Sequence, residues 1–464
     1  MIAFLQFLAT LADRLVSRIW NLIAGLFRKR LKAGLWLGFE IQDGRTTRKK
    51  VFLPHIRRAE HTSITGKTGT GKSYFLRSQI LRDLEQRNGI VLFDIHGDLT
   101  PFVLQAVSAL ESKTGQDLSK KLIVIDPSDR EYSTGFNVLE ARGEQNVYRL
   151  ISEFTHILQN RWGQEFGPRT LELLSNSLHA LSENRLTLLE LAAFLTNASF
   201  RSQCLKRVSN NEIKAYFESR FNPASEAMQQ SMGSPVLNKL TGLTVDPKFR
   251  HLLGQSESTF SLHTVLARNL WLVIKLSKGE LGEQAMTFGS LLFAKLKNAI
   301  FARRSRSLLS IYADEVQNLL SSDLSLEVLL SECRKFNVSV VTANQYFDQL
   351  PSHVQAAMAA IGTHIYFQLS AGDANHVSKS LGSGKALASV LQNLPHRVFV
   401  LKSGSHGFRH IATPPIRPFQ TDYIALYARC RAEWCRSRAD IEAEIVRRQP
   451  TVKKTFAEVA DAWE

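Results

Sequence analysis

The residues with the clearest chemical potential in this 464-residue sequence lie near its N-terminal end, at positions 66–73. They satisfy the P-loop pattern of two glycines at a fixed spacing followed by Lys and Ser. Glycines let successive backbone N–H groups approach a phosphate chain, and a helix that follows directs its positive end at the anion. In this pattern Lys72 reaches the β- and γ-phosphates and Ser73 ligates magnesium. We therefore expect a site for ATP and Mg²⁺ formed by Gly66, Lys67, Thr68, Gly69, Thr70, Gly71, Lys72 and Ser73.

A second candidate is a pair of carboxylates. The apolar residues 308–313 predict a strand that ends at Asp314 and Glu315. Open α/β sheets bind ligands at the carboxyl ends of their strands. Asp314 suits magnesium coordination through water, and Glu315 suits the base that polarises an attacking water. Because the chain also carries a P-loop, we interpret the pair as catalytic rather than as a helix cap.

Two more polar side chains could complete this chemistry. Residues 338–342 predict a strand that ends near Gln345, from where an amide can sense the γ-phosphate. Arg334 lies on the helix expected before that strand, and it could neutralise transition-state charge in the site of a neighbouring subunit. The alternative for Arg334 is an ordinary surface salt bridge.

The elements that would position these residues have the pattern of an α/β core. Residues 61–65, 89–94, 122–126 and 270–276 read as short apolar strands, and residues 73–88 have helical spacing after the P-loop. Continuous apolar strands separated by helices predict a mainly parallel sheet covered on both faces. Residues 35–53 predict a hairpin whose exposed Arg45, Arg48, Lys49 and Lys50 either touch a polyanion or are solvated.

Changes of pattern along the chain predict five parts. Residues 1–33 are an apolar or amphipathic helix with a basic flank, 34–140 begin the ATPase domain, and 141–265 form an all-helical insertion. Residues 266–418 complete the ATPase domain with the carboxylate pair and Gln345. The basic helical tail at 419–464 mixes arginines with acidic residues, which is typical of a solvated or subunit-contacting helix.

The N-terminal segment favours membrane association. Residues 2–27 are mostly apolar with one polar stripe, and Arg28, Lys29, Arg30 and Lys32 follow. Asp13 and Arg14 oppose a simple span, because a central charge costs about 2.5–3.5 kcal/mol on insertion scales. Three alternatives stay open: an interfacial amphipathic helix, a span whose polar stripe faces a bundle, and a helix packed on protein.

Overall charge and cysteine usage indicate which binding partners and which cellular compartment to expect. Lys and Arg total 58 against 42 Asp and Glu, a formal charge of +16 that favours nucleic acid or an anionic membrane face. The four cysteines are too scattered for a disulfide framework or a zinc site, although Cys430 and Cys435 share one expected helix. Ordinary thiols in a reducing cytosol are the expected state. No nuclease-like cluster of metal ligands is evident either.

Taken in order, these motifs resemble the HerA/FtsK superfamily of ring-forming motor ATPases, and within it the conjugative coupling proteins of type IV secretion. The matching stretches are 61–73 (HTSITGKTGTGKS), 93–99 (FDIHGDL), 313–318 (ADEVQN), 331–336 (SECRKF) and 343–345 (ANQ). The resemblance implies a RecA-like fold in which Asp314 and Glu315 are the Walker B pair, Gln345 is the sensor and Arg334 is the arginine finger. It also implies a homo-hexamer that pulls DNA through a central channel, with an N-terminal membrane anchor. The chain departs from the family at Asp13 and Arg14, and it has no room before residue 61 for the β-barrel of the HerA branch.

The sequence thus predicts a magnesium-dependent, ATP-driven DNA translocase in conjugative or type IV secretion transfer. Its core would be cytoplasmic, held at the inner membrane by residues 2–27 and in contact with secretion-channel partners. Three alternatives stay open: a HerA-type translocase in DNA processing or defence, an ATPase that delivers protein substrates, and a non-hydrolysing nucleotide switch.

Overall fold

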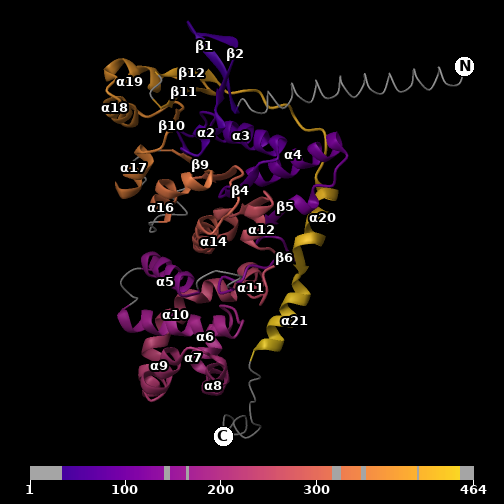
Figure 1. Ribbon diagram of the computed structural model, residues 1–464, viewed down its shortest axis with the longest axis vertical. Coiled ribbons are helices and arrows are strands. Elements are labelled where there is room, and N and C mark those ends of the chain that lie inside the picture. The colour runs from indigo at the N-terminus through magenta and orange to yellow at the C-terminus, as the bar shows by residue number, and fades with distance from the viewer. Residues whose placement is uncertain are drawn as a thin grey trace, which may run out of the picture.

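One large twisted sheet organises the chain (Figure 1). A computed structural model describes residues 34–140, 147–162, 167–315, 325–345, 352–404 and 407–449. Within these ranges the sheet has the strand order β2-β1-β12-β11-β10-β3-β9-β8-β4-β7-β5. The strands are β1 (Leu35–Gln42), β2 (Arg45–Leu53), β3 (Thr62–Thr65), β4 (Gly89–Asp94), β5 (Leu122–Ile125), β7 (Trp271–Lys275), β8 (Leu309–Asp314), β9 (Val338–Asn344), β10 (Thr363–Tyr366), β11 (Val398–Ser403) and β12 (Arg409–Ala412).

The sheet is parallel where the site is built and antiparallel at one side. The strands from β10 to β5 in the order above pair in parallel. Strands β11, β12, β1 and β2 extend the sheet in antiparallel pairs, and β1 with β2 forms the expected hairpin. The predicted α/β class and mainly parallel sheet are therefore confirmed.

Helices cover both faces of the sheet because successive strand residues point to opposite sides. In β4, Ile90 and Leu92 join the core beneath α3 (Lys72–Gln86), α4 (Leu99–Thr114) and α20 (Ile424–Trp434). Val91 and Phe93 face the other way, into the core formed with α12 (Leu262–Ala267), α14 (Glu283–Phe301) and α16 (Ser325–Glu332). Continuous apolar strands are what a sheet buried on both faces requires.

Smaller helices complete the layers. Helices α18 (Ala371–Ser380) and α19 (Gly384–Gln392) pack on β10 and β11. The others near the sheet are α2 (His55–Arg58), α13 (Lys278–Leu281), α17 (Ser352–Ala359) and the short turns η1 (Ser119–Lys121) and η4 (Cys333–Phe336).

Between β6 (Tyr132–Thr134) and β7 the described chain is helical. These elements are α5 (Val147–Trp162), α6 (Pro168–Glu183), α7 (Glu190–Thr196), α8 (Ala198–Arg207), α9 (Asn211–Tyr216), η3 (Phe217–Phe221), α10 (Glu226–Val245), α11 (Pro247–Leu253) and α12. The elements from α5 to α11 gather at the lower end of Figure 1, around buried aromatic side chains that include Phe194, Phe217 and Phe221.

The C-terminal strap, residues 424–448, packs on its own chain, a set of contacts that the predicted solvated or subunit-contacting tail does not include. It consists of α20, β13 (Cys435–Ser437) and α21 (Arg438–Arg448), and it runs along one side of the molecule from α4 to the helices of the insertion (Figure 1). Strand β13 pairs with β6, so Cys435 lies on a strand and not on the helix of Cys430. Leu426 and Ile441 are buried in the chain's own core.

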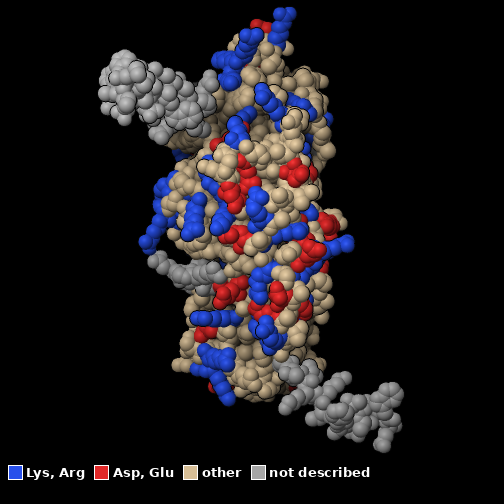
Figure 2. All heavy atoms as spheres, turned by 90° about the vertical axis from the view of Figure 1, so that its right-hand side faces the viewer, with Lys and Arg blue, Asp and Glu red and all other residues tan. Residues whose placement is uncertain are grey.

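The mixed charges of the strap serve contacts within the chain. Arg429 pairs with Glu111 at 2.6 Å, and Glu442 pairs with Arg250 at 2.9 Å. Figure 2 shows basic and acidic side chains interleaved on this side of the molecule. The sequence shows that charges of both signs alternate here, but the partners of Arg429 and Glu442 lie more than 150 residues away in sequence.

The predicted N-terminal helix and its membrane contact, residues 2–27, lie outside the described residues. Among the residues that are described, no helix is long and apolar enough to cross a membrane.

Candidate active site

Four neighbouring strands, β3, β9, β8 and β4, bring the candidate residues to one edge of the sheet. In the register of the sheet Thr65 lies beside Asn344, and Asp314 lies beside Ala343. The four strands are parallel, so their carboxyl ends meet at this edge. Each strand therefore contributes the residues that follow it to one cavity.

The P-loop connects β3 to α3 and depends on its glycines. A Cβ at Gly66 would lie 2.6 Å from the Cβ of Phe367, so the first glycine lets the loop pass the end of β10. Gly71 has φ +113°, a backbone conformation that residues other than glycine rarely adopt. Gly69 also has a positive φ, and the space around its Cα is open. The loop is thus shaped to present backbone N–H groups without side chains in the way.

Lys72 and Ser73 begin the helix that follows. The ammonium of Lys72 donates to the carbonyl oxygens of Gly66 at 2.5 Å and Lys67 at 3.0 Å. Burial lowers the pKa of Lys72, and the nearby carboxylates of Glu315 and Asp314 partly offset this. Desolvation strengthens the attraction of the Lys72 ammonium for an anion, and the two nearby carboxylates favour its protonated form.

Asp314 and Glu315 are both buried at the end of β8. Burial raises the pKa of Asp314 to about 6, and the adjacent Glu315 adds to this rise. Glu315 has φ +54°, and its backbone N–H donates to the carbonyl of Ala343 at 2.9 Å. A positive φ at a non-glycine residue is uncommon and clusters at functional sites. Two buried carboxylates side by side favour a divalent cation, which would relieve their repulsion.

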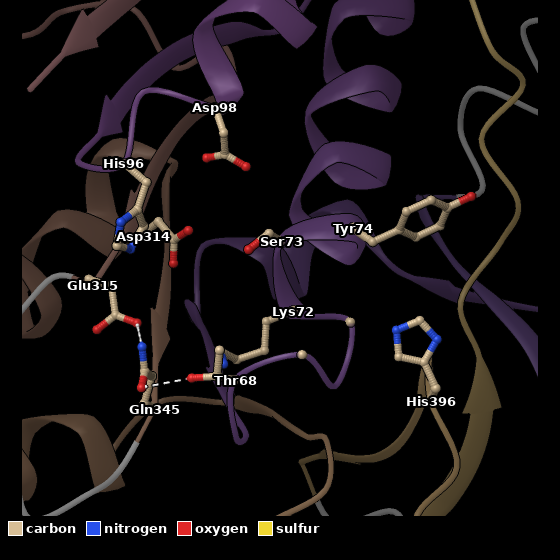
Figure 3. A pocket seen from close by; sticks show the side chains of 12 residues that line it. Thr68, Lys72, Ser73, Tyr74, His96, Asp98, Asp314, Glu315, Gln345 and His396 are labelled. Carbon is tan, nitrogen blue, oxygen red and sulfur yellow. Dashed lines mark hydrogen bonds between the residues drawn. The ribbon is translucent and has the colours of Figure 1, made fainter. Parts of the chain in front are cut away.

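Gln345 joins the carboxylate pair to the P-loop (Figure 3). Its amide nitrogen donates to Glu315 Oε1 at 2.9 Å, and its amide oxygen accepts a hydrogen bond from Thr68 Oγ1 at 3.1 Å. One side chain thus contacts both the predicted base and the loop expected to hold phosphate. This is the position that a γ-phosphate sensor needs.

The loop after β4 adds His96 and Asp98 to the lining of the cavity. Asp94 accepts hydrogen bonds from the backbone N–H groups of Gly97 at 2.8 Å and Thr100 at 2.7 Å, which fix the turn. The turn carries His96 and Asp98 to the wall of the cavity. The sequence could have indicated both residues as site candidates, because both follow a strand whose carboxyl end faces the site.

Arg334 does not reach the site of its own chain. It lies in η4, before β9, whereas Gln345 follows the far end of that seven-residue strand, about 20 Å away at the usual rise per residue. Its side chain is 65% exposed, and its guanidinium contacts Glu60 at 3.2 Å. Arg334 therefore does not line the cavity of its own chain, and its contact with Glu60 is a surface salt bridge.

The cavity enclosed by these residues suits a nucleotide. Its volume is about 390 Å³, within the range of about 300–1,000 Å³ usual for small-molecule sites. It is lined by Thr68, Gly69, Gly71, Lys72, Ser73, Tyr74, His96, Asp98, Asp314, Glu315, Gln345 and His396. Carboxylate and hydroxyl oxygens are ligands that Mg²⁺ prefers, and Mg²⁺ usually shares its shell with water and phosphate. Within the described ranges no group of three His, Cys, Asp or Glu residues could hold a metal on its own.

Comparisons with known proteins point to one family. Residues 45–389 match the family model of the type IV secretion-system coupling protein DNA-binding domain. No curated protein matches the chain significantly.

Solved structures show the same fold. The plasmid coupling protein TrwB in complex with a non-hydrolysable ATP analogue is 17% identical, with a TM-score of 0.57 over 80% of this chain and 90% of that one. VirB4 of Thermoanaerobacter pseudethanolicus is 15% identical, with a TM-score of 0.57 over 83% of this chain and 97% of that one. TrwB in complex with ADP and Mg²⁺ is 18% identical, with a TM-score of 0.55 over 80% and 89%. The fold is therefore RecA-like, as the resemblance implies.

Proposed function

Because this chain belongs to the family of type IV secretion-system coupling proteins defined by their DNA-binding domain, we propose that it is a Mg²⁺-dependent ATPase that translocates DNA. The observation that carries the proposal is the chain of hydrogen bonds from Thr68 through Gln345 to Glu315. It connects the loop that would hold the phosphates to the carboxylate that would activate water.

The residues of the chain divide the work of hydrolysis. Glu315 is the base that accepts a proton from the attacking water, and the hydrogen bond from Gln345 holds its carboxylate in place. Lys72 moves its ammonium from the carbonyls of the P-loop to the β- and γ-phosphates of ATP. Ser73 and Asp314 would hold the cation. Bound Mg²⁺ neutralises charge on the phosphate oxygens.

The hydrogen bonds of Gln345 would also couple the state of the nucleotide to movement of DNA. A side chain that contacts both the base and the P-loop changes its partners when the γ-phosphate arrives or leaves. Movement of Gln345 would then pass along β9 to the parts of the protein that contact DNA. Sequence-independent contact with phosphates fits the formal charge of +16, because phosphate contacts carry no base information.

The assembly belongs to the proposal as well. The exposed position of Arg334, away from its own cavity, supports a ring in which it completes the site of the neighbouring subunit. We propose a homo-hexamer with a cytoplasmic core. Residues 2–27 would hold it at the inner membrane, next to the secretion channel. The five parts expected from the sequence, with a helical insertion at 141–265, are the proposed domain organisation.

Steady-state hydrolysis by the full-length protein tests this function. We expect single-stranded or duplex DNA to raise the rate, and we expect Lys72→Ala and Glu315→Gln to remove the activity. Loss of a general base alone costs about 10²–10⁴-fold. Glu332→Gln, which changes an exposed glutamate paired with Lys335 on the surface, is the matched control and should behave as the unmodified protein.

Two results would contradict the proposal. Hydrolysis that is fast but indifferent to DNA would favour delivery of protein substrates. A folded protein that binds ATP but does not hydrolyse it would favour a nucleotide switch.

A further inference from the structure

The candidate ATP cavity has two chemically different ends (Figure 3). Asp314, Glu315 and Gln345 form one end. Tyr74 and His396 form the other, and the P-loop lies between them. A nucleoside triphosphate is also asymmetric, with charged phosphates at one end and a planar base at the other. The aromatic end is therefore expected to serve a role other than phosphate binding.

His396 belongs to a turn that is fixed to the P-loop. The backbone N–H of its neighbour Arg397 donates to the carbonyl of Thr70 at 3.0 Å, and the carbonyl of Arg397 accepts from Thr413 at 2.9 Å. A Cβ on Gly71 would lie 3.1 Å from the Cα of Arg397, so the two segments are in close contact. Arg397 has φ +62°, a conformation that is uncommon outside glycine and persists only where the surroundings hold it. The turn is thus fixed to the loop that would hold the phosphates.

The side chain of Tyr74 is also held in one orientation. Its hydroxyl accepts a hydrogen bond from the backbone N–H of Ile416 at 2.7 Å, and the guanidinium of Arg397 lies 3.9 Å from its ring centre. The ring therefore cannot turn freely, and one of its faces is covered by a cation. His396, in contrast, is exposed and has its ring at the cavity wall.

We infer that Tyr74 and His396 form the nucleoside subsite of this cavity, in which the imidazole of His396 stacks on the face of the base. The inference rests on the proposed function, because it takes the cavity to bind a nucleoside triphosphate. Stacking on an aromatic side chain tolerates every base, because every base has a π-face. Among the described residues that line this end, no amide or carboxylate is placed to read the edge of a base. The subsite adds affinity for the nucleoside, whereas the P-loop binds the phosphates.

Calorimetry with two ligands tests the subsite on the full-length protein. One ligand is the Mg²⁺ complex of a non-hydrolysable ATP analogue, and the other is Mg²⁺-tripolyphosphate, which lacks the nucleoside. We expect His396→Ala to weaken binding of the ATP analogue roughly 5- to 150-fold, the range that corresponds to one base–aromatic stack. Its affinity for tripolyphosphate should stay unchanged. His396→Phe keeps a planar ring and should bind the analogue as tightly as the unmodified protein.

The control is His376→Ala, which removes another exposed histidine, on α18, that does not line the cavity. It should change neither affinity. The inference is overturned if His396→Ala binds the analogue normally, or if it loses both ligands equally. A loss in His396→Phe equal to that in His396→Ala would overturn stacking in favour of a hydrogen bond from the imidazole. Failure of the unmodified protein to bind either ligand would refute the proposed function itself, which separates the two failures.

Discussion

Replacement of Asp83 by Asn should destabilise the protein strongly, because it breaks a fully buried ion pair. The guanidinium of Arg58 contacts both carboxylate oxygens of Asp83, at 2.7 and 2.6 Å, and the two side chains are 1% and 0% exposed. Asp83 also accepts from the hydroxyl of Tyr312 at 2.7 Å, and Arg58 donates to Ser310 at 2.7 Å. The pair thus joins α2 and the P-loop helix α3 to β8, the strand that carries Asp314.

The magnitude follows from the burial of the partner. In Asp83→Asn the guanidinium of Arg58 stays charged and buried without a counter-charge, a situation that costs about 3–5 kcal/mol. Removal of that guanidinium in the double variant Asp83→Asn/Arg58→Met should recover part of the loss, because no orphan charge is left. Glu85→Gln is the matched control on the same helix. It breaks the more exposed contact of Glu85 with Arg82 and should cost less than about 1 kcal/mol.

Urea denaturation, followed by circular dichroism at pH 7, measures these differences as changes in the free energy of unfolding. We expect the order of stability to be unmodified protein and Glu85→Gln, then the double variant, then Asp83→Asn. A cost below about 1 kcal/mol for Asp83→Asn, or a double variant no more stable than Asp83→Asn, would refute the reasoning.

Three further predictions concern the site. Burial and Glu315 raise the folded-state pKa of Asp314 to about 6, above its unfolded value, so its ionisation opposes folding at pH 7 and the fold gains stability as the pH falls through 6. Asp314→Asn should therefore raise the melting temperature without Mg²⁺ while it abolishes hydrolysis, and a lower melting temperature would contradict this cause. Protonation of Asp314 should also weaken the affinity of the nucleotide-free protein for Mg²⁺ as the pH falls through about 6. Arg334→Ala should leave stability within about 1 kcal/mol but lower hydrolysis by about 10³-fold or more if it completes a neighbour's site. Lys335→Ala, which removes the adjacent exposed cation, should change neither stability nor hydrolysis. An active Arg334→Ala variant would rule out the role.

The sequence predicted those parts of the site whose chemistry is local. The P-loop is a contiguous motif, and Asp314 and Gln345 each follow an apolar run that can only be a buried strand. Parallel strands then bring their carboxyl ends together without any need for pairwise contacts to be known. His96 could have been found by the same rule.

Contacts between segments that lie far apart in the sequence could not be predicted in this way. His396 precedes an antiparallel strand, so the rule about carboxyl ends does not point to it, and its neighbour Arg397 meets Thr70 across 327 positions of sequence. The ion pair of Arg58 with Asp83 looks like two solvated charges in sequence, because nothing local shows that both are buried. The contacts of the C-terminal strap within its own chain could not be predicted for a similar reason, since Arg429 and Arg431 have their partners in α4 and between β5 and β6, far away along the chain.

Displacement of a third strand from triplex DNA tests the central claim most directly, because it reports movement along DNA rather than hydrolysis alone. The full-length protein with Mg²⁺ and ATP should release the third strand, and the non-hydrolysable analogue should not support release. Glu315→Gln should bind ATP and DNA without displacing the strand. Rapid ATP hydrolysis in the presence of DNA, with no displacement of the third strand by the unmodified protein, would contradict the account.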